Sequence, residues 1–439
     1  NSVMMSSTIP STRYSFSSSL FKFLKGSTKS LGFRLETSGL KRFSVHNCSV
    51  EKTLFLSILS TMDLTRTAFG VWGGGRYMHF GEKVEEERFL ALINRSYDEG
   101  VRTFMTADVY GQGAADEMLG RGLAGKDRDS YCLVGAVGHD FYEGERAGAR
   151  GFPRFTDASL RTPESYADYL RAATEKSLTR CGTEKFDLLL LHNPDVTGYT
   201  HEAVWEGMAA LKDAGLTDRI GIAPGPANGF TLDMLACMEK FAAQIDWAMV
   251  ILNPLEPWPG GLLLPAAEKF GIKVITRVVD YGGLFHGDVR PGHAFAEGDH
   301  RVYRPSGWVE VGNEKMERMR EIAEEHGVSL LQLACLWNLA HPAVASVIPT
   351  LIQEAGEDAK TIESKLDDLA ALPDLTLTAE QRDGITDIGN NKGCMDLKGA
   401  NPNFDGPEPL PDRWGLQPGH KEVGERWGVV PERDLVCTM

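Results

Sequence analysis

The sequence lacks three features that would point to a membrane, a nucleic acid or a disulfide framework. No apolar run approaches the roughly 18 residues that span a bilayer, and the longest candidate, Leu54 to Leu59, is far too short. Excess positive charge is missing, because the formal net charge is −15, which disfavours nonspecific binding to nucleic acid or anionic membrane. The seven cysteines form no C-x-x-C pair, so we expect reduced thiols and no zinc cluster.

Acidic residues are scarce in one place, the first 50 residues, where seven Lys or Arg accompany a single acid, Glu36. This Ser-rich, basic composition is typical of an organelle transit peptide. It fits a disordered leader or a mispredicted start equally well, with Met62 opening the protein. We therefore treat residues 1–61 as a separate leader. We expect a cytoplasmic protein, or a plastid or mitochondrial one if the leader is a targeting signal.

From about Phe69 onward, short β-rich runs alternate with longer amphipathic segments, several of which stop at a Gly as helices commonly do. The eight strand-like runs lie at 69–74, 101–106, 130–136, 186–191, 219–223, 247–252, 272–279 and 344–349. Eight alternating units with near-continuously apolar strands predict an α/β fold, a (β/α)8 TIM barrel. An open doubly wound sheet is the alternative, but no G-x-G-x-x-G follows the first run at a helix start.

Three long segments should shape the rim of this barrel. They are the loops 139–162 and 280–310, and a tail rich in Pro, Gly, Asn and Asp. We expect a barrel over residues 62–372 and a loop-rich tail, 373–439, that closes over it. Chemistry in such barrels lies at the C-terminal ends of the strands, so side chains at those ends are the candidates for a site.

Four segments carry a resemblance to a known family. "GVRTFMTADVYGQGAADEMLGRGL" (100–123) resembles the second βα unit of the aldo-keto reductases, whose pattern reads G-x-x-x-x-D-T-A-x-x-Y-G before a helix with E-x-x-L-G. "FDLLLLHNPD" (186–195) resembles the fourth strand with its His. "GIKVITRVVDYGGLF" (271–285) resembles the seventh strand and phosphate loop, and "VASVIPT" (344–350) the eighth strand. The similarity runs over nearly all of residues 66 to 372.

The resemblance implies hydride transfer between C4 of NADP(H) or NAD(H) and a carbonyl, with acid-base work by a tetrad of Asp, Tyr, Lys and His. Tyr110 falls at the proton donor and His192 at the carbonyl-orienting His. Met105 stands in place of the Asp, and Ala136 in place of the Lys. We infer that the ion pair is lost as a unit, because an Asp without its Lys would be an unpaired buried charge. The expected substrate is a small carbonyl or sugar-like compound, polar or anionic.

The same resemblance, with the strand-end rule, assigns cofactor binding to six residues: Gly73, Gly74, Asn253, Arg277, Pro349 and Thr350. A glycine pair lets the backbone approach a ribose or pyrophosphate closely. An Arg at the end of a buried strand needs an anion, which we expect to be Asp280 or a ligand. No basic residue follows the eighth strand until Lys360, so the choice between NADP(H) and NAD(H) stays open.

Other polar residues near strand ends allow further interpretations. Asp108 and Asp140 could serve as replacement acids. A basic loop is interpreted as solvated surface, with an anionic-substrate clamp as the alternative; it contains Arg146, Arg150, Arg154 and Arg161. Five histidines could meet at a metal, but no H-x-x-x-H or C-x-x-C pair anchors one, so we expect none; they are His139, His192, His286, His293 and His300.

Two other functions compete with an oxidoreductase. One is a lyase or isomerase acting on a sugar-like substrate with a metal at the His-rich rim. The other is a non-catalytic scaffold that binds the cofactor without turnover. The fold alone cannot choose among them, because barrels host many chemistries.

Overall fold

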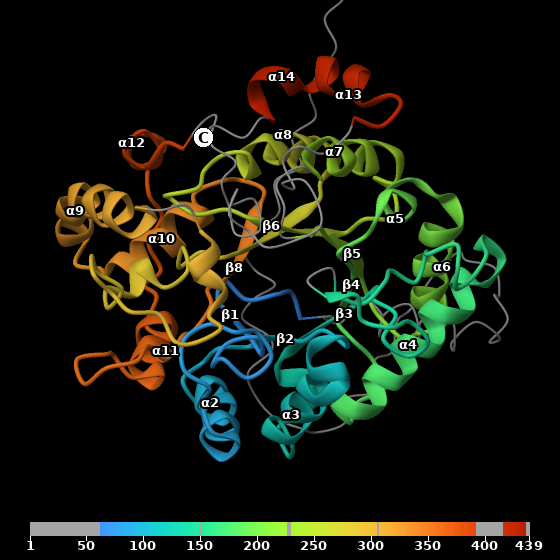
Figure 1. The fold of residues 1–439 in the computed structure, drawn as a ribbon, viewed down its shortest axis with the longest axis horizontal. Coiled ribbons are helices and arrows are strands. Elements are labelled where there is room, and N and C mark those ends of the chain that lie inside the picture. Colours follow the sequence, from blue (N-terminus) through green and yellow to red (C-terminus); the bar gives the residue numbers. More distant parts are fainter. Residues whose placement is uncertain (1–61, 149–150, 226–229, 305–306, 392–415, 436–439) are drawn as a thin grey trace, which may run out of the picture. The chain divides into compact units, whose positions relative to one another are not determined.

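The structure, a computed structural model, describes residues 62–148, 151–225, 230–304, 307–391 and 416–435. Eight parallel strands pair in sequence order, β1 to β8. They are Ala68–Gly70, Thr103–Met105, Cys132–Val137, Leu188–His192, Ile220–Ala223, Trp247–Ile251, Lys273–Arg277 and Val344–Ile348. A parallel bridge between Thr67 and Val347 joins the first strand to the last, so the sheet curls into a nearly closed barrel (Figure 1). The predicted barrel is confirmed, and the doubly wound alternative is wrong.

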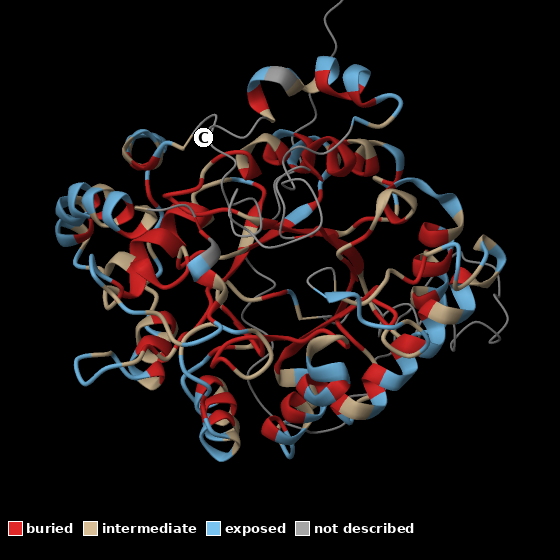
Figure 2. Ribbon diagram, viewed as in Figure 1, coloured by how far each residue is buried: buried red, intermediate tan, exposed pale blue. Residues whose placement is uncertain are grey.

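A ring of helices surrounds the strands (Figure 1). The helices between consecutive strands are α2 (Glu86–Asp98), α3 (Ala114–Gly122), α4 (Tyr166–Cys181), α5 (Val196–Thr200), α6 (Glu202–Asp213), α7 (Thr231–Lys240), α8 (Leu264–Phe270), α9 (Trp308–His326) and α10 (Leu330–Leu339). After β8 come α11 (Ile362–Ala370), α12 (Ala379–Gly389), α13 (His420–Trp427) and α14 (Pro431–Asp434). Their outward faces are exposed while the strands are buried (Figure 2).

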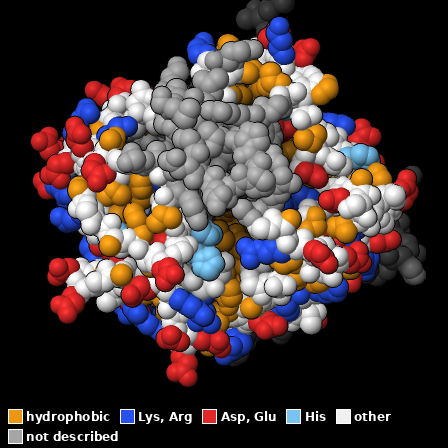
Figure 3. Space-filling view, viewed as in Figure 1, with side chains coloured by type: hydrophobic (Ala, Val, Ile, Leu, Met, Phe, Trp, Pro, Cys, Tyr) orange, Lys and Arg blue, Asp and Glu red, His pale blue; other side chains and the backbone are white. Residues whose placement is uncertain are grey.

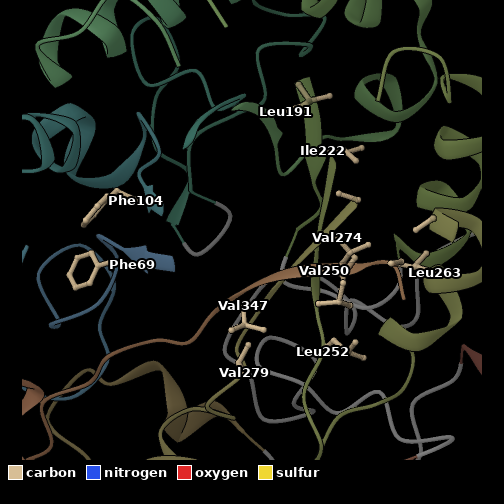
Figure 4. Close-up of a cluster of buried hydrophobic side chains, with 14 of the residues drawn as sticks. Phe69, Phe104, Leu191, Ile222, Val250, Leu252, Leu263, Val274, Val279 and Val347 are labelled. Carbon is tan, nitrogen blue, oxygen red and sulfur yellow. The ribbon is translucent and has the colours of Figure 1, made fainter. Parts of the chain in front are cut away.

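The strands alternate side chains between two apolar layers, as the period of two in a β-strand requires. In β2, Phe104 points into the layer between sheet and helices, while Met105 belongs to a second cluster inside the barrel. In β1, Phe69 lies in the outer layer with its ring centroid 6.2 Å from that of Phe104 (Figure 4). Because both layers are apolar and buried, the strands are near-continuously apolar in sequence.

Helix boundaries follow local capping chemistry. Gly182 and Gly271 adopt left-handed φ values of 67° and 70° where α4 and α8 end. Capping boxes open α10 at Ser329 and α12 at Thr378. The first strand is shorter than its predicted range, 69–74, because the chain turns directly after Gly70, where the Gly73 N–H donates to the Gly70 carbonyl at 3.1 Å.

A buried carboxylate ties the second and third βα units together. Asp116 of α3 accepts hydrogen bonds from Thr106 Oγ1 and Ser177 Oγ, both at 2.8 Å. Its Oδ2 also accepts hydrogen bonds from Arg180 Nη2, at 2.9 Å, and from Arg180 Nε, at 3.0 Å. Because Thr106 follows β2 and the other two side chains come from α4, one acid joins three elements.

The described parts of the tail pack against the outside of the helix ring. Helix α12 packs on α9, and α13 packs on α7. Arg426 of α13 pairs with Glu239 of α7 at 2.5 Å. Residues 392–415 and the predicted leader, 1–61, lie outside the described residues, so both the closure of the tail over the barrel and the leader stay predictions.

Two expectations about the chain's chemistry concern membranes and thiols. None of the described helices combines the length and the apolar character needed to cross a bilayer. Four cysteines are buried and free, as expected for incidental thiols: Cys132, Cys181, Cys237 and Cys335. The other three lie outside the described residues.

Candidate active site

Two adjoining cavities open at the C-terminal ends of the strands. The inner cavity encloses about 890 Å³, its open mouth included, and is walled mainly by apolar side chains such as Trp72, Met105 and Met249. The outer cavity encloses about 1330 Å³ on the same basis and is lined largely by basic side chains. Five residues form the shared wall: Met78, Tyr110, His192, Asn193 and Arg277. Three of the sequence-predicted site residues therefore lie together, in this wall.

Tyr110 stands in a short 3-10 turn directly after β2. The turn, Tyr110–Gly113, holds left-handed φ values of 59° at Gly111 and 54° at Gln112. The phenol ring packs edge-on against Trp72, with centroids 6.2 Å apart, and against His192, at 5.6 Å. Burial raises the pKa of Tyr110 above its usual value, and the charge of Arg277 opposes that rise. The phenol is therefore protonated at neutral pH and able to donate a proton.

His192 is the last residue of β4 and is 5% exposed. Burial, followed by the neighbouring His139 and the charge of Arg277, holds the pKa of His192 well below its usual value. Its Nδ1 is buried without a hydrogen-bond partner among the described residues. A neutral imidazole with an unused nitrogen, next to a protonated phenol, can orient and polarise a carbonyl oxygen.

Arg277 ends β7 and reaches across the barrel mouth. Its Nη2 donates to the carbonyl oxygens of Pro224, at 2.8 Å, and Gly225, at 3.1 Å. Its Nε is buried with no partner among the described residues, and none of their carboxylates lies within 4 Å of the guanidinium. Of the two anions expected to meet Arg277, Asp280 is not its partner, and a ligand anion stays a prediction. The Asp280 carboxylate instead accepts from the backbone N–H groups of Gly283, at 2.8 Å, and Thr350, at 2.7 Å.

The two positions that the sequence resemblance predicts to depart from the family tetrad lie inside the barrel. Met105 is 2% exposed and Ala136 is fully buried, and both belong to the inner apolar cluster. Met105 also forms part of the inner cavity wall. Apolar packing therefore fills the region where the resemblance would put an ion pair.

The remaining predicted cofactor residues divide into one that lines the inner cavity and four that do not. Thr350 lines it, and its hydroxyl accepts from Trp72 Nε1 at 3.3 Å. Gly74 donates its N–H to the carbonyl of Leu351 at 2.9 Å, and a side chain there would meet Phe89 at 2.9 Å. Gly73 and Pro349 are buried outside the lining. For these residues, cofactor binding stays a prediction.

Asn253 also lies outside the cavity lining, because its amide is used within the chain. Its Nδ2 donates to Glu256 Oε2 and to the carbonyl of Val278, both at 3.0 Å. Its Oδ1 accepts from the N–H groups of Leu255, at 3.0 Å, and Glu256, at 2.9 Å. These contacts give Asn253 the role of shaping the turn after β6. Direct cofactor binding by Asn253 stays a prediction.

Sequence reasoning missed two titratable residues of the inner cavity. Glu256 and Arg304 both line it. Burial raises the pKa of Glu256, and the charge of Arg304 opposes the rise. The Arg304 guanidinium stacks over Tyr281 at 4.5 Å and Trp308 at 4.7 Å, and its Nε is buried without a partner among the described residues. Both lie in loops that follow strands, β6 and β7, but the sequence analysis singled out Asn253 and Arg277 there and not these two.

The two proposed replacement acids do not reach the site. Asp108 is fully buried, lines neither cavity, and has no hydrogen-bond partner for its carboxylate among the described residues. Burial, then repulsion from Asp116, holds the pKa of Asp108 well above its usual value. Asp140 pairs with Arg161 at 2.5 Å and caps the loop after β3 through the N–H of Tyr142 at 3.0 Å.

Three of the five histidines proposed for a metal, His139, His192 and His300, line the outer cavity, whereas His286 and His293 do not. His286 Nε2 lies 2.9 Å from the carbonyl of Thr350, and His293 Nε2 lies 3.2 Å from Glu354. His300 packs against His79, with ring centroids 5.1 Å apart. No group of three or more His, Cys, Asp or Glu in the described part of the chain is arranged to hold a metal ion. The metal centre that the lyase or isomerase alternative requires is therefore not found among the described residues.

The basic loop is only partly solvated surface. Arg161 is held by Asp140 and Glu143, whereas Arg146 is exposed at the outer cavity. Arg154 turns inward and lines that cavity, so its interpretation as surface is wrong. Arg150 lies outside the described residues.

A parallel barrel with its polar cavity at the C-terminal strand ends defines the class of (β/α)8 barrel proteins that build one site from several strand ends. The model of the aldo/keto reductase family matches residues 68–378, and the chain belongs to that family. The family resemblance read from the sequence is confirmed.

Similar curated proteins include a probable voltage-gated potassium channel subunit beta of Arabidopsis thaliana, 24% identical over 308 residues, covering 67% of this chain and 86% of that protein. A 6-dehydroglucose reductase of Agrobacterium fabrum is 24% identical over 309 residues, with the same coverage. Among solved structures, a glycerol dehydrogenase from Gluconobacter oxydans is 22% identical with a TM-score of 0.59, covering 75% of this chain and 92% of that one. An aldo-keto reductase from Bacillus halodurans is 21% identical with a TM-score of 0.53, covering 75% and 94%.

Proposed function

We propose that this chain is an oxidoreductase that uses NADPH or NADH to reduce a small carbonyl compound, and that it works with an altered catalytic tetrad. The observation that carries the proposal is the convergence of Tyr110, His192 and Arg277 on one wall between two cavities. Relatives named a 6-dehydroglucose reductase and a glycerol dehydrogenase favour a sugar-like or polyol-derived substrate.

The inner cavity suits an anionic dinucleotide. Arg277 and Arg304 line it, and the Nε of each is buried without a partner among the described residues. Gly282 also lines it with a φ of 65°, and a side chain there would meet the Arg304 guanidinium at 3.3 Å. Unsatisfied guanidinium groups beside a glycine backbone fit close approach of a pyrophosphate. When bound, the cofactor would supply the hydride.

The choice between NADPH and NADH depends on a cation for the 2′-phosphate. Lys360 is the first basic residue after β8, and its Nζ donates to the carbonyl of His286 at 2.6 Å. Glu354, in the same segment, is buried and paired with Arg301 at 2.6 Å. Neither the buried Glu354 carboxylate nor the hydrogen-bonded Lys360 ammonium group is placed to bind the 2′-phosphate. Both NADPH and NADH should therefore be tested in the first assay.

Tyr110 acts as the general acid in this proposal. The carbonyl carbon receives the hydride, and the carbonyl oxygen receives the phenolic proton of Tyr110, which yields the alcohol and an oxidised cofactor. His192, as a neutral imidazole, would donate its N–H to the same oxygen and fix its direction. Because burial disfavours a phenolate, its formation needs a nearby positive charge.

Arg277 would supply that charge. The family's Lys is replaced by Ala136, but the charge of Arg277 acts on Tyr110 and opposes the effect of burial on the phenol. A permanently charged guanidinium can stabilise the phenolate without itself titrating. Arg277 would therefore take over the electrostatic part of the missing lysine, while Met105 and Ala136 keep the space filled.

The deciding experiment compares Tyr110→Phe with the parent protein. We expect the variant to keep its affinity for NADPH or NADH, followed by quenching of Trp fluorescence. Its kcat should fall about 10²- to 10⁴-fold on a panel of aldehydes and sugars. Tyr97→Phe is the matched control, because Tyr97 lies on α2 and bonds Ser130 at 2.6 Å. Equal kcat values for Tyr110→Phe and the parent would refute the acid role.

A second candidate function is a cofactor-binding scaffold without turnover. It is favoured by the apolar Met105 and Ala136, and by the relatives named as potassium channel beta subunits. Saturable cofactor binding with no turnover on any carbonyl would select it. Failure of both NADPH and NADH to bind at millimolar concentration would reject both functions.

A further inference from the structure

The outer cavity has a charge opposite to that of the chain. The sequence has a formal net charge of −15, yet no Asp or Glu is among the described residues that line this cavity. The titratable cations and imidazoles there are Arg76, Arg146, Arg154, Arg277, His79, His139, His192 and His300. In the space-filling view, His and Lys or Arg side chains lie next to one another near the middle of the displayed face (Figure 3).

Arg154 is the cation best placed to meet a ligand in this cavity. Its Nε donates to the carbonyl of Asn193, and its Nη1 donates to the carbonyl of Phe152 at 3.1 Å. Nη1 also lies 3.0 Å from His139 Nδ1. Its Nη2 makes no hydrogen bond to the described part of the chain, where no carboxylate lies within 4 Å of the guanidinium. The Asp195 carboxylate acts on Arg154 without forming an ion pair with it, and a partly buried guanidinium without a direct ionic partner is costly, so a bound anion would complete it.

The other arginines of this cavity are less available or less central. Arg76 donates to the carbonyl of Val84 at 2.8 Å and pairs with Glu86 at 3.4 Å. Arg146 is exposed, so its charge is screened by solvent. Arg277 belongs to the wall shared with the inner cavity.

The position of Arg154 relative to His192 is set by its contacts with His139 and Asn193. His139 packs on His192 with ring centroids 5.1 Å apart, so Arg154 lies one imidazole beyond the carbonyl-orienting histidine. The carbonyl oxygen of Asn193 accepts the hydrogen bond from Arg154 Nε. Asn193 has a left-handed φ of 47°, which is unusual for a residue other than Gly. Strained backbone held by its surroundings is common in binding sites.

We propose that the outer cavity selects a small carbonyl substrate that carries a carboxylate or phosphate group, with Arg154 as the residue that binds the anion. The anionic group lies a few bonds from the carbonyl, because one imidazole separates Arg154 from His192. Arg146 adds attraction at the rim. This inference rests on the proposed carbonyl reduction for its kinetic test, whereas its binding test does not.

The kinetic test compares three aldehydes of one shape. They are 4-carboxybenzaldehyde, 4-formylphenyl phosphate and the neutral methyl 4-formylbenzoate. The readout is the ratio of kcat/KM for each anion to kcat/KM for the ester. We expect the parent protein to favour at least one anion, and Arg154→Gln to lower that ratio about 10- to 100-fold, as expected for loss of a charge-assisted hydrogen bond. The anion with the larger ratio identifies the group that the site takes.

Matched variants separate recognition from structure. Arg171→Gln removes the same charge from α4, where Arg171 is exposed and pairs with Glu175 at 2.9 Å, and should keep the parent ratio. Arg154→Lys should keep part of the preference. If Arg154→Gln lowers kcat/KM for the anionic aldehydes and for the ester in proportion, the ratio is unchanged. Arg154 then only supports the loop, and the proposal fails. A parent protein that prefers the ester also overturns it.

A binding measurement keeps the inference testable if no carbonyl is turned over. Calorimetric titration with 4-(hydroxymethyl)benzoate and with 4-(hydroxymethyl)phenyl phosphate uses the alcohols that the reaction would form. We expect saturable binding of at least one to the parent and to Arg171→Gln, and at least tenfold weaker binding to Arg154→Gln. The exposed Arg146→Gln, which should fold normally, is expected to weaken binding less. Equal affinity in all four proteins would reject the anion site and leave the proposed reduction standing.

Discussion

Replacing His139 by Gln should make the protein less sensitive to acid. His139 is 8% exposed, beside Arg154 and His192. Burial, then the charge of Arg154, lowers the pKa of His139 to about 3. The unfolded chain should titrate this group near its usual value of about 6.5. Between these two pH values, His139 is protonated in the unfolded state and neutral in the native state.

The sign and size of the effect follow from that difference. A histidine with a depressed native pKa leaves stability intact above about pH 6.5 and lowers it as the pH falls towards 3. At pH 5 the unfolded form of His139 is almost fully protonated, which costs the native state about 2 kcal/mol relative to pH 7.5. His139→Gln removes this cost, because glutamine does not titrate.

Urea denaturation at pH 7.5 and pH 5.0 measures the free energy of unfolding of each protein at each pH. We expect the parent to lose about 2 kcal/mol more than His139→Gln over this interval. Between pH 7.5 and pH 8.5 the two proteins should change in parallel, whatever their absolute stabilities. If the free energies of unfolding of the two proteins change in parallel from pH 7.5 to pH 5.0, His139 accepts a proton in the native state. That result would refute the inference that a neutral imidazole lies beside Arg154.

Three further substitutions probe the frame of the site. Asp116→Ala leaves Arg180 without its carboxylate and should cost about 3–5 kcal/mol in urea unfolding, so a loss below 1 kcal/mol would count against a structural ion pair. Gly389→Ala would bring a Cβ to 1.6 Å from a backbone oxygen of the loop after β6. It should therefore abolish hydrogen-exchange protection in α12 while the barrel stays protected, and unchanged protection would refute this. Met105→Asp should destabilise the barrel, and adding Ala136→Lys should recover part of the loss. Strict additivity in that double-mutant cycle would show that the two positions do not interact.

The barrel was readable from the sequence because its signals are local and repeated. Each strand is a short apolar run, and helices end at glycines such as Gly182. The same periodicity placed Tyr110 and His192 at strand ends, where the structure puts them in one cavity wall. Strand limits were less predictable, because β1 ends early at a turn in which the Gly73 N–H donates to the Gly70 carbonyl.

Pairings made by long loops could not be read from the sequence. Asp280 lies three residues from Arg277, yet its carboxylate points to the backbone of Thr350, a contact 70 residues away in the chain. Arg154 looked like its solvated neighbours, and only the fold shows it turned towards His139. Composition and spacing predict which groups are present near a rim, whereas the direction of each side chain depends on packing against distant segments.

The closure of the barrel has a consequence for how the chain folds. Among the described residues, the backbone pairing that joins the first strand to β8 is the bridge from Thr67 to Val347, supported by the hydrogen bond from Val347 N–H to the carbonyl of Arg66 at 2.9 Å. During synthesis, β1 can pair with β2 early, but its other edge stays open until nearly all of the barrel has left the ribosome. Long-range parallel pairing is slow, and open strand edges attract other chains. Joining these two edges should therefore be the late, aggregation-exposed step, and a nascent chain halted before β8 would depend on chaperones.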